Sequence, residues 1–174
     1  MSSAEPPVNR ASITARPGLG YDSHRFAAGG PMILGGVRVP SEVKLVGHSD
    51  GDAIAHAVTD AVLGAAAAGD IGEMFADTEE ANRGRDSIEM LRAAVARVRA
   101  RGWRVGNVDV TVIAERPKIG PHREAMRAAL AAALGVGIED VSVKGKTNER
   151  MGFVGREEGL ACIAVATLVA AAGD

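Results

Sequence analysis

Apolar residues recur at helical spacing in the segment 87–101, where Ile88, Leu91 and Val95 lie three or four positions apart. Side chains at this spacing line one face of an α-helix, so the segment is predicted to be helical and to end at Gly102. Two further helices are predicted over residues 49–68, with Ser49 as N-cap, and over residues 123–134.

Extended structure is predicted where β-branched residues alternate with polar ones or form short apolar runs. Two such runs flank a Gly-Gly pair within residues 32–40, a pattern typical of a β-hairpin. A short apolar stretch over residues 18–21 leads into Asp22, and three more strands are predicted over residues 108–114, 141–144 and 160–169. The order of these elements predicts an α/β fold of the α+β sandwich type, in which helices pack on one face of one mixed β-sheet.

The first residues of the chain lack this periodicity. Residues 1–15 are polar and contain proline, and we expect them to form a disordered leader. The remaining residues, 16–174, have the length of one compact domain and are predicted to form a single domain.

Composition narrows the choice of partners. Apolar residues make up 47% of the chain but aromatic residues only 3%, so the core must be built from Ala, Val, Leu and Ile. Such thin side chains hint that some apolar surface is buried against other subunits. The net charge is −2 and the sequence holds no large Lys/Arg cluster, which argues against nucleic acid as a partner.

Three features indicate a cytoplasmic protein. Cys162 is the only cysteine, so no internal disulfide can form, and its apolar surroundings suggest a buried thiol in a reducing compartment. The first residues lack the charged start and apolar core of a secretion signal. The longest apolar run, residues 160–172, is too short to span a bilayer, which takes about 20 residues. We therefore expect no membrane partner.

Candidate chemistry begins with Asp22 and His24, which are separated by one residue. If this segment is extended, both side chains leave the same face of the strand. Imidazole nitrogen together with carboxylate oxygen suits zinc or a similar divalent ion. Two residues specify little, however, and an isolated pair of this kind is more often a turn aspartate beside a surface histidine.

A second cluster, residues 47–56, places two histidines, two aspartates and a serine around a predicted helix start. Backbone N–H groups at a helix N-terminus favour phosphate oxygens. His56 shares a helix face with Asp52 and Asp60, either of which would accept the second imidazole N–H and fix the tautomer. The alternative is an N-capped helix with a buried histidine, but together with the first pair the cluster favours a metal site.

Two glycine-containing loops carry further polar residues. The first, residues 70–78, is acidic and follows the predicted helix, where an ordinary connection between helices is an equally good interpretation. The second, residues 144–149, carries two lysines, a threonine and a glutamate, a mixture that fits a diphosphate and its counter-ion. Arg156 follows and could bind a phosphate through both guanidinium arms. Taken alone, each of these segments is more often a solvated loop.

Taken in order, these segments resemble the 2-C-methyl-D-erythritol 2,4-cyclodiphosphate synthase family of the non-mevalonate isoprenoid pathway. The matching motifs are GLGYDSHRF, ILGGVRVP, GHSDGDAIAHAVTDAVLGAAAAGDIGEMFADT, NVDVTVIAERPKIGPH and VKGKTNERMGFVGREEG, and they cover about residues 16–170. Two positions depart from the usual pattern. Ala76 stands where the family usually has proline, and Lys146 stands where some members have threonine.

The resemblance implies a homotrimer with active sites at the subunit boundaries. It also implies a Zn²⁺ ion held by Asp22, His24 and His56. A second divalent ion, Mg²⁺ or Mn²⁺, would be held by Glu149 together with the substrate diphosphate.

The resemblance further implies that His48 and Thr147 are catalytic residues, which stabilise the transition state. Other residues would contact the substrate, and those within residues 114–120 and 146–149, which would form the cytidine and diphosphate pocket, would do so across the subunit boundary. The substrate-binding residues implied in this way are Ser49, Asp70, Ile71, Gly72, Phe75, Ala76, Asp77, Thr78, Glu79, Ala114, Glu115, Arg116, Pro117, Lys118, Ile119, Gly120, Lys146, Asn148, Phe153 and Arg156.

The implied activity is that of a phosphorus–oxygen lyase, which transfers a phosphoryl group within one molecule. The 2-phosphate of 4-diphosphocytidyl-2-C-methyl-D-erythritol 2-phosphate attacks the β-phosphorus, the 2,4-cyclodiphosphate forms, and CMP departs. Two other functions would use the same Asp/His cluster: a metal-dependent phosphohydrolase, and a non-enzymatic module that binds a nucleotide or a metal.

Overall fold

The computed structural model describes residues 14–76 and 78–171. In chain order the elements are β1 (Ala15–Ala28), β2 (Met32–Leu34), β3 (Val37–Val39), β4 (Val43–Leu45), α1 (Ala53–Ala65), α2 (Ile71–Met74), η2 (Glu80–Asn82), α3 (Ser87–Arg99), β5 (Trp103–Ile113), η3 (Gly120–His122), α4 (Arg123–Leu134), η4 (Ile138–Asp140), β6 (Val141–Lys146), α5 (Gly152–Gly155) and β7 (Gly159–Ala170).

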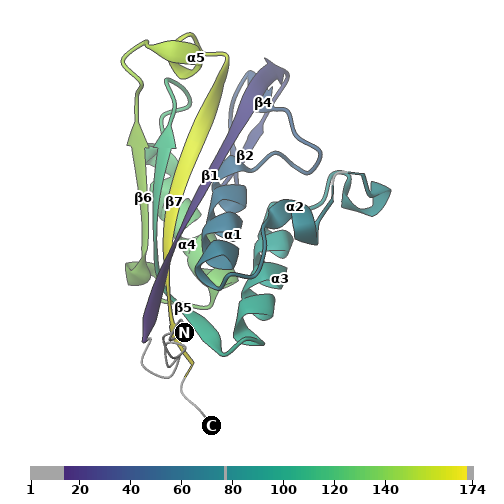
Figure 1. Ribbon diagram of the computed structural model, residues 1–174. Helices are drawn as coiled ribbons and strands as arrows, with labels where there is room; N and C mark the ends of the chain where they lie inside the picture. Colours follow the sequence, from purple (N-terminus) through teal and green to yellow (C-terminus); the bar gives the residue numbers. More distant parts are fainter. Residues whose placement is uncertain (1–13, 77, 172–174) are drawn as a thin grey trace, which may run out of the picture.

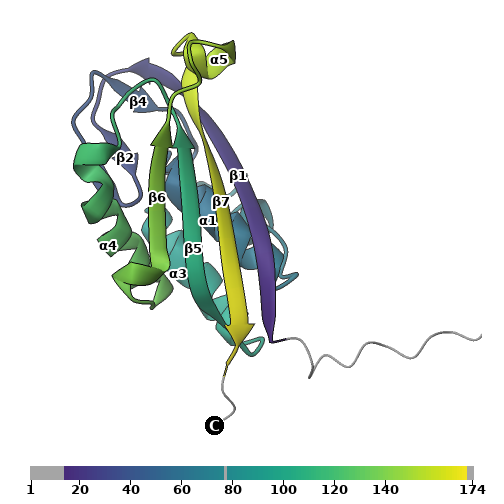
Figure 2. The ribbon, with the colours of Figure 1, turned by 90° about the vertical axis from the view of Figure 1, so that its left-hand side faces the viewer.

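Five strands form one mixed sheet in the order β4-β1-β7-β5-β6 (Figure 1). Strands β5 and β6 run parallel, whereas the other neighbouring pairs are antiparallel. Figure 2 shows the sheet from its open side, with α1 and α3 behind the strands. Strands β2 and β3 form a separate two-stranded ribbon. The predicted α/β fold, a mixed sheet with helices packed on one face, is therefore confirmed.

Helix α1 lies very close to strand β1 because both surfaces carry small residues. The helix turns buried alanines toward the sheet, and the strand places Gly18 and Gly20 opposite them. A Cβ atom at Gly18 would overlap the carbonyl oxygen of Ala61, and one at Gly20 would overlap that of Ala57. The contact between helix and strand is thus made by backbone against backbone.

Strand β1 is longer than the sequence pattern indicated. The apolar pattern marked only residues 18–21, yet the strand runs from Ala15 to Ala28 and pairs with β7 as far as Arg25. Its second half places Asp22 and His24 on the helix-covered side, where an ordinary strand would carry apolar residues. Hydrophobic alternation therefore fails there for a local reason, since this half of the strand carries polar side chains that face a cavity.

The predicted N-cap of the first helix is wrong. Helix α1 begins at Ala53 and is capped by Asp52, not by Ser49. The Asp52 carboxylate is fully buried and accepts two N–H groups of the first helical turn, both at 3.1 Å. It also accepts two N–H groups from the β2–β3 turn, at 2.8 and 2.6 Å. Burial raises the pKa of Asp52, a shift that these backbone donors oppose.

The face of the sheet opposite the helices carries exposed apolar side chains. Leu19 and Tyr21 of β1 are 68% and 54% exposed, and they pair across the strands with Val165 and Ile163 of β7. The two β7 residues are 39% and 37% exposed. We call these four residues the open-face patch.

Other expectations can be placed briefly. Cys162 is buried, as expected, and burial raises the pKa of its thiol. In the described ranges, none of the helices has the length and apolar character needed to cross a membrane. The leader predicted over residues 1–15 falls mostly outside the described residues, and β1 begins at Ala15.

Candidate metal centre and its cavity

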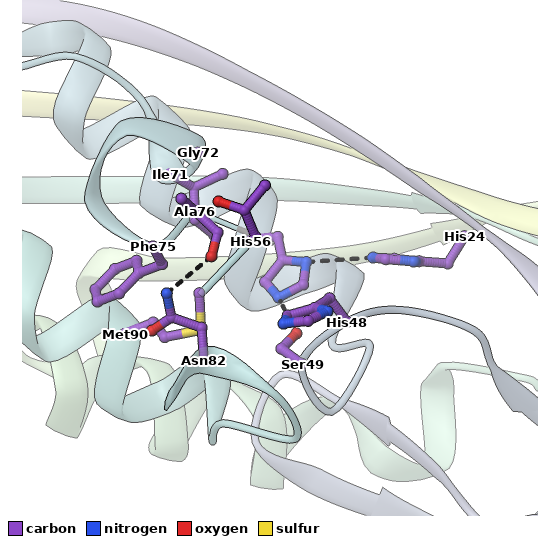
Figure 3. Close-up of a pocket in the computed structure, with 11 residues that line it drawn as sticks. His24, His48, Ser49, His56, Ile71, Gly72, Phe75, Ala76, Asn82 and Met90 are labelled. Atoms are coloured by element: carbon purple, nitrogen blue, oxygen red, sulfur yellow. Dashed lines mark hydrogen bonds between the residues drawn. The ribbon is translucent and has the colours of Figure 1, made fainter. Parts of the chain in front are cut away.

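Three side chains from two elements converge on one point between β1 and α1. Asp22 and His24 leave the same face of β1, and His56 reaches them from α1. Asp22 Oδ2 lies 2.9 Å from His24 Nε2 and 3.1 Å from His56 Nδ1. The two nitrogens are 3.2 Å apart, and Figure 3 shows the two rings directed at each other.

This triangle has the size expected around a small cation. Zinc is bound by histidine nitrogen and carboxylate oxygen at about 2.0–2.2 Å, which places tetrahedral ligand atoms about 3.3 Å apart. The three predicted ligands form the group of acidic and histidine side chains in the described residues that fits a metal ion. Three protein ligands leave a fourth position for another group, as in catalytic zinc sites.

Hydrogen bonds fix the orientation of His24. Its Nδ1 lies 2.8 Å from the carbonyl oxygen of Val46, which can only accept, so Nδ1 carries the proton in the neutral ring. The lone pair of Nε2 is therefore directed at the centre of the triangle. A metal-binding histidine is typically held in this way by a backbone carbonyl.

His56 is held by serines, and the predicted role of aspartates one helical turn away is wrong. Its Nε2 lies 2.9 Å from Ser49 Oγ and 2.8 Å from Ser87 Oγ. Asp52 accepts backbone N–H groups, as described above, and Asp60 accepts the N–H of Ile71 at 2.8 Å. Because Asp52 occupies two N–H groups of the α1 start, the predicted phosphate site at this helix N-terminus is not supported either.

The charges of the triangle favour a cation. Burial alone would raise the pKa of Asp22, but its close contacts with the rings of His24 and His56 hold the pKa of this carboxyl well below its usual range. Burial likewise opposes protonation of His24, yet the hydrogen bond with Asp22 and its negative charge raise the His24 pKa above 6.5. An ionised carboxylate thus sits between two imidazoles at neutral pH.

The triangle opens onto a cavity of about 510 Å³, which we call the metal-side cavity (Figure 3). It brings together residues from three candidate segments of the sequence: Asp22 to His24, residues 47–56 and residues 70–78. Most of the predicted substrate residues between Ser49 and Glu79 line it. Its lining residues are His24, His48, Ser49, His56, Ile71, Gly72, Phe75, Ala76, Thr78, Asn82 and Met90.

His48 is distinctive among the lining residues. Its Nε2 is buried and has no hydrogen-bond partner in the described part of the chain. A buried polar atom without a partner is costly, so a ligand atom in the cavity would relieve that cost.

Sequence reasoning missed Asn82 and Met90 in this cavity. Asn82 is 5% exposed, and its Nδ2 donates to the carbonyl oxygen of Ala76 at 2.9 Å. Arg85 lies over the Phe75 ring at 4.8 Å, a cation–π contact that holds the same loop. No sequence motif marks an asparagine that acts by closing a loop.

Two predicted substrate residues, Asp70 and Glu79, are not among the residues that line this cavity. Asp70 is the N-cap of α2 and accepts the N–H of Glu73 at 2.8 Å. Glu79 receives a weak bond from Asn82 at 3.5 Å. Asp77 lies outside the described residues.

The predicted nucleotide residues gather elsewhere, in the loops that follow β5 and β6. The backbone N–H groups of Asn148 and Arg150 donate to Glu115 Oε1 at 3.1 and 3.0 Å, which ties the two loops together. Thr147 donates its hydroxyl proton to Glu149. These contacts confirm that the two predicted segments are neighbours.

A second pocket of about 520 Å³ lies beside these loops, and we call it the loop-side pocket. One of its lining residues, Gly155, belongs to α5, which lies at the end of the sheet (Figure 1). It is lined by Glu115, Arg116, Arg150, Gly155, Arg156 and Glu157. Two of its arginines form ion pairs, Arg116 with Glu157 at 2.6 Å and Arg156 with Glu158 at 2.7 Å.

The two groups of predicted residues remain apart within one chain. No residue of 114–120 or 146–156 is among those that line the metal-side cavity in the part of the chain that the structure describes. Glu149 does not join the Asp22–His24–His56 group there, and Thr147 does not face it.

The profile of the YgbB family matches residues 15–169, which is most of the chain. The chain belongs to the YgbB family. A relative from Gemmatimonas aurantiaca named 2-C-methyl-D-erythritol 2,4-cyclodiphosphate synthase is 65% identical over 159 residues, covering 91% of this chain and 96% of the relative. The family resemblance inferred from the motifs is confirmed.

Solved structures agree with this YgbB assignment. A Plasmodium falciparum protein described as an IspF CDP complex is 33% identical, with a TM-score of 0.79 over 91% of this chain and 98% of that one. The bifunctional IspDF from Campylobacter jejuni is 38% identical with a TM-score of 0.88, and this chain spans only 43% of its length. The hydrolase and the binding module, the two alternatives, are not favoured by these YgbB relatives.

Proposed function

We propose that this chain converts 4-diphosphocytidyl-2-C-methyl-D-erythritol 2-phosphate to 2-C-methyl-D-erythritol 2,4-cyclodiphosphate and CMP, as a phosphorus–oxygen lyase. The observation that carries this proposal is the Asp22–His24–His56 triangle, which opens onto a cavity lined by predicted substrate residues between Ser49 and Thr78. Relatives at up to 65% identity are named for this activity.

We assign Zn²⁺ to the triangle, because its nitrogen and oxygen donors and its spacing suit that ion. A bound divalent cation neutralises charge and polarises phosphoryl oxygens. Glu149 is proposed as the ligand of a second ion, Mg²⁺ or Mn²⁺, which would accompany the diphosphate. Its carboxylate is an oxygen donor of the type that these ions prefer, and it already lies beside Thr147.

The side chains of the cavity would bind and orient the substrate. His48 carries a buried nitrogen without a partner, and Ser49 presents a hydroxyl beside His56; both are proposed to hydrogen-bond phosphate oxygens. Such fixed donors stabilise charge that develops in the transition state. The loop from Ile71 to Thr78 would enclose the methylerythritol part.

The bond changes take place within the substrate. An oxygen of the 2-phosphate attacks the β-phosphorus, a new P–O bond closes the ring, and the bond from the β-phosphorus to the CMP oxygen breaks. No protein nucleophile is required. Holding the two phosphates in line can lower the barrier by about 7–11 kcal/mol, so positioning is the main task of the residues.

We further propose a homotrimer in which the loop-side pocket of one subunit completes the metal-side cavity of its neighbour. Two observations support this arrangement. The predicted nucleotide residues do not reach the metal-side cavity of their own chain in the described ranges, and the open-face patch presents apolar side chains to the surroundings. Residues 16–174 are proposed as one domain of a cytoplasmic enzyme, consistent with the buried free thiol of Cys162.

One assay separates the candidate functions. The purified protein is incubated with the diphosphocytidyl substrate, Zn²⁺ and Mg²⁺, and the products are identified by phosphorus NMR. Release of CMP with a cyclic diphosphate is expected. A linear diphosphate would instead indicate a phosphohydrolase, and binding without CMP release would indicate a non-enzymatic module.

A further inference from the structure

The nitrogen of His56 that faces away from the metal triangle lies between two serine hydroxyls. Ser87 Oγ is 2.8 Å from His56 Nε2, and Ser49 Oγ is 2.9 Å from the same atom. A hydroxyl can donate or accept, so these distances alone do not say which nitrogen of the ring carries the proton. The partners of the two serines decide that question.

Ser87 is committed to one direction by Asp50. The Ser87 hydroxyl donates to Asp50 Oδ1, and the backbone N–H of Ser87 donates to Asp50 Oδ2 at 3.1 Å. A serine has one hydroxyl proton, and here the carboxylate takes it. Toward His56, Ser87 Oγ can therefore only accept, so Nε2 carries a proton; His56 Nδ1 lies 3.1 Å from Asp22 Oδ2, and in the neutral ring that binds a metal through Nδ1 the single proton is on Nε2.

We propose that Asp50 and Ser87 are positioning residues of the metal centre. Asp50 orients the Ser87 hydroxyl, Ser87 holds the proton of His56 on Nε2, and the Nδ1 lone pair is thereby directed at the metal. This inference rests on the metal assignment made above. It adds two residues, one of them on α3, that touch neither the metal nor the substrate.

The local structure is built to keep this relay in place. Ser87 is the first residue of α3 and is fully buried, directly after the N-cap Asp86. Asp50 N–H donates to the carbonyl oxygen of Arg85 at 3.2 Å, and Gly84 N–H donates to that of His48 at 2.9 Å. The loop before α1 and the start of α3 are thus joined on both sides of the relay.

The relay also separates the roles of the two serines. With Ser87 accepting from Nε2–H, the nearby Ser49 has no nitrogen lone pair to donate to, since Nε2 carries the proton. The Ser49 hydroxyl proton is then free to donate into the cavity that Ser49 lines. Ser87 positions the ligand, and Ser49 is left to bind phosphate oxygen.

The test measures zinc affinity by chelator competition, and the proton position on His56 by ¹⁵N NMR of its ring in the metal-free protein. Ser87→Ala removes the acceptor and is expected to weaken zinc binding by about 10–100-fold, as for other outer partners of metal ligands. Asp50→Asn replaces one of the two carboxylate oxygens with an NH₂ group, although both oxygens accept hydrogen bonds from Ser87. When the NH₂ group of this amide faces Ser87 Oγ, the Ser87 hydroxyl can no longer donate to residue 50. The hydroxyl would then donate to His56 Nε2, and the proton of the His56 ring would move to Nδ1.

Two comparisons distinguish this relay from a merely structural role. The double variant Asp50→Asn/Ser87→Ala should bind zinc as Ser87→Ala alone does, within about twofold, because the two residues act in series. The matched control is Asp86→Ala, which removes two cap bonds to Ile88 and Glu89 at the same helix start without touching His56. It should lower Tm yet leave zinc affinity and the His56 NMR signals unchanged.

The outcomes separate the relay from the metal assignment. If the parent protein binds zinc and Ser87→Ala binds it equally tightly, the relay is wrong and the metal site stands. Additive losses in the double variant, or a loss of zinc in Asp86→Ala that follows its loss of stability, would also overturn the relay. If the parent protein binds no zinc, the metal assignment fails and the relay fails with it.

Discussion

The metal-side cavity and the loop-side pocket satisfy their polar side chains in different ways. In the metal-side cavity, the ligand residues are partly buried and each imidazole has a specific partner on its outer nitrogen. In the loop-side pocket, Arg116 and Arg156 and their carboxylate partners are about half exposed or more, and they form ion pairs at the surface.

This difference shows which part of the site is preorganised by a single chain. Partly buried polar groups whose orientation is fixed by neutral backbone or hydroxyl partners keep that orientation without ligand. Exposed ion pairs are worth little, typically under about 1 kcal/mol, and they exchange partners readily. We therefore expect the metal-side cavity to be complete in each subunit, whereas the loop-side pocket takes its working form with ligand or a neighbouring subunit.

The largest expected effect comes from removing a metal ligand. His56→Ala should abolish bound zinc and turnover together. This loss of zinc affinity is greater than the about 10–100-fold typical when a residue that hydrogen-bonds to a metal ligand is replaced. Metal content and CMP release are measured on the same preparation. The matched control is His122→Ala at the start of α4, outside the cavity, which should retain both. Zinc retained in His56→Ala would refute its role as a ligand.

A mixing experiment tests whether the two pockets belong to different subunits. Glu149→Gln should lower turnover by about 10²-fold, comparable to the loss of a fixed charge-stabilising group, and leave zinc content unchanged. This variant and His56→Ala are then unfolded and refolded together. In mixed oligomers, some shared sites would combine the intact metal-side cavity of a Glu149→Gln subunit with the intact Glu149 of a His56→Ala subunit. Recovered activity is expected; no recovery in mixed oligomers would place both halves in one subunit.

Zinc binding should weaken as the pH falls. The pKa of His24 is raised above 6.5, so its proton competes with the metal at a higher pH than for an ordinary histidine, while Asp22 stays ionised. Below the His24 pKa, affinity should drop by about tenfold per pH unit for each proton displaced. Titrations of zinc between pH 8 and pH 5 check this slope.

The stability of the zinc-free protein should change with pH in the opposite direction, because the contribution of His24 to the free energy of unfolding falls as the pH rises. A raised pKa of His24 means that the folded state binds its proton more tightly than the unfolded state does. That stabilisation is complete below the unfolded pKa near 6.5 and is lost as the pH rises through the folded pKa. The increase in Tm caused by zinc should therefore grow from pH 5 to pH 8, and a constant increase would contradict the assignment.

The smallest effect is expected at the loop that closes the metal-side cavity. Asn82→Ala removes the bond to the Ala76 carbonyl oxygen, worth about 1 kcal/mol. KM should rise by up to about fivefold, with zinc content and kcat nearly unchanged. Steady-state kinetics measure this split, and a large loss of kcat would mean that Asn82 acts on the reacting groups.

The sequence predicted the site better than it predicted the local structure that holds it. Residue type and spacing made Asp22, His24 and His56 plausible ligands, and the family resemblance carried by the long motifs around them made the set specific. The length of β1 was missed, because polar residues replace the apolar ones where the strand faces the cavity. The cap of α1 was misplaced because Ser49 and Asp52 both suit that position, and the turn that contacts Asp52 is distant in sequence.

The contacts that no pattern could indicate are those between distant residues of ordinary type. Asp50 and Ser87 are 37 positions apart, and neither stands in a recognisable motif for the other. Asn82 acts through one backbone carbonyl, which any nearby residue would offer. Such pairings depend on how α3 packs beside α1, and that packing follows from the whole core.

Gly18 and Gly20 carry a consequence for how tolerant this protein is to substitution. They bear no chemistry, yet they set the separation between β1 and α1, and hence the span across which His56 meets Asp22 and His24. An alanine at either position would press against helix backbone and displace a ligand rather than remove one. A mutational scan should therefore find these two sites as intolerant as the ligands themselves.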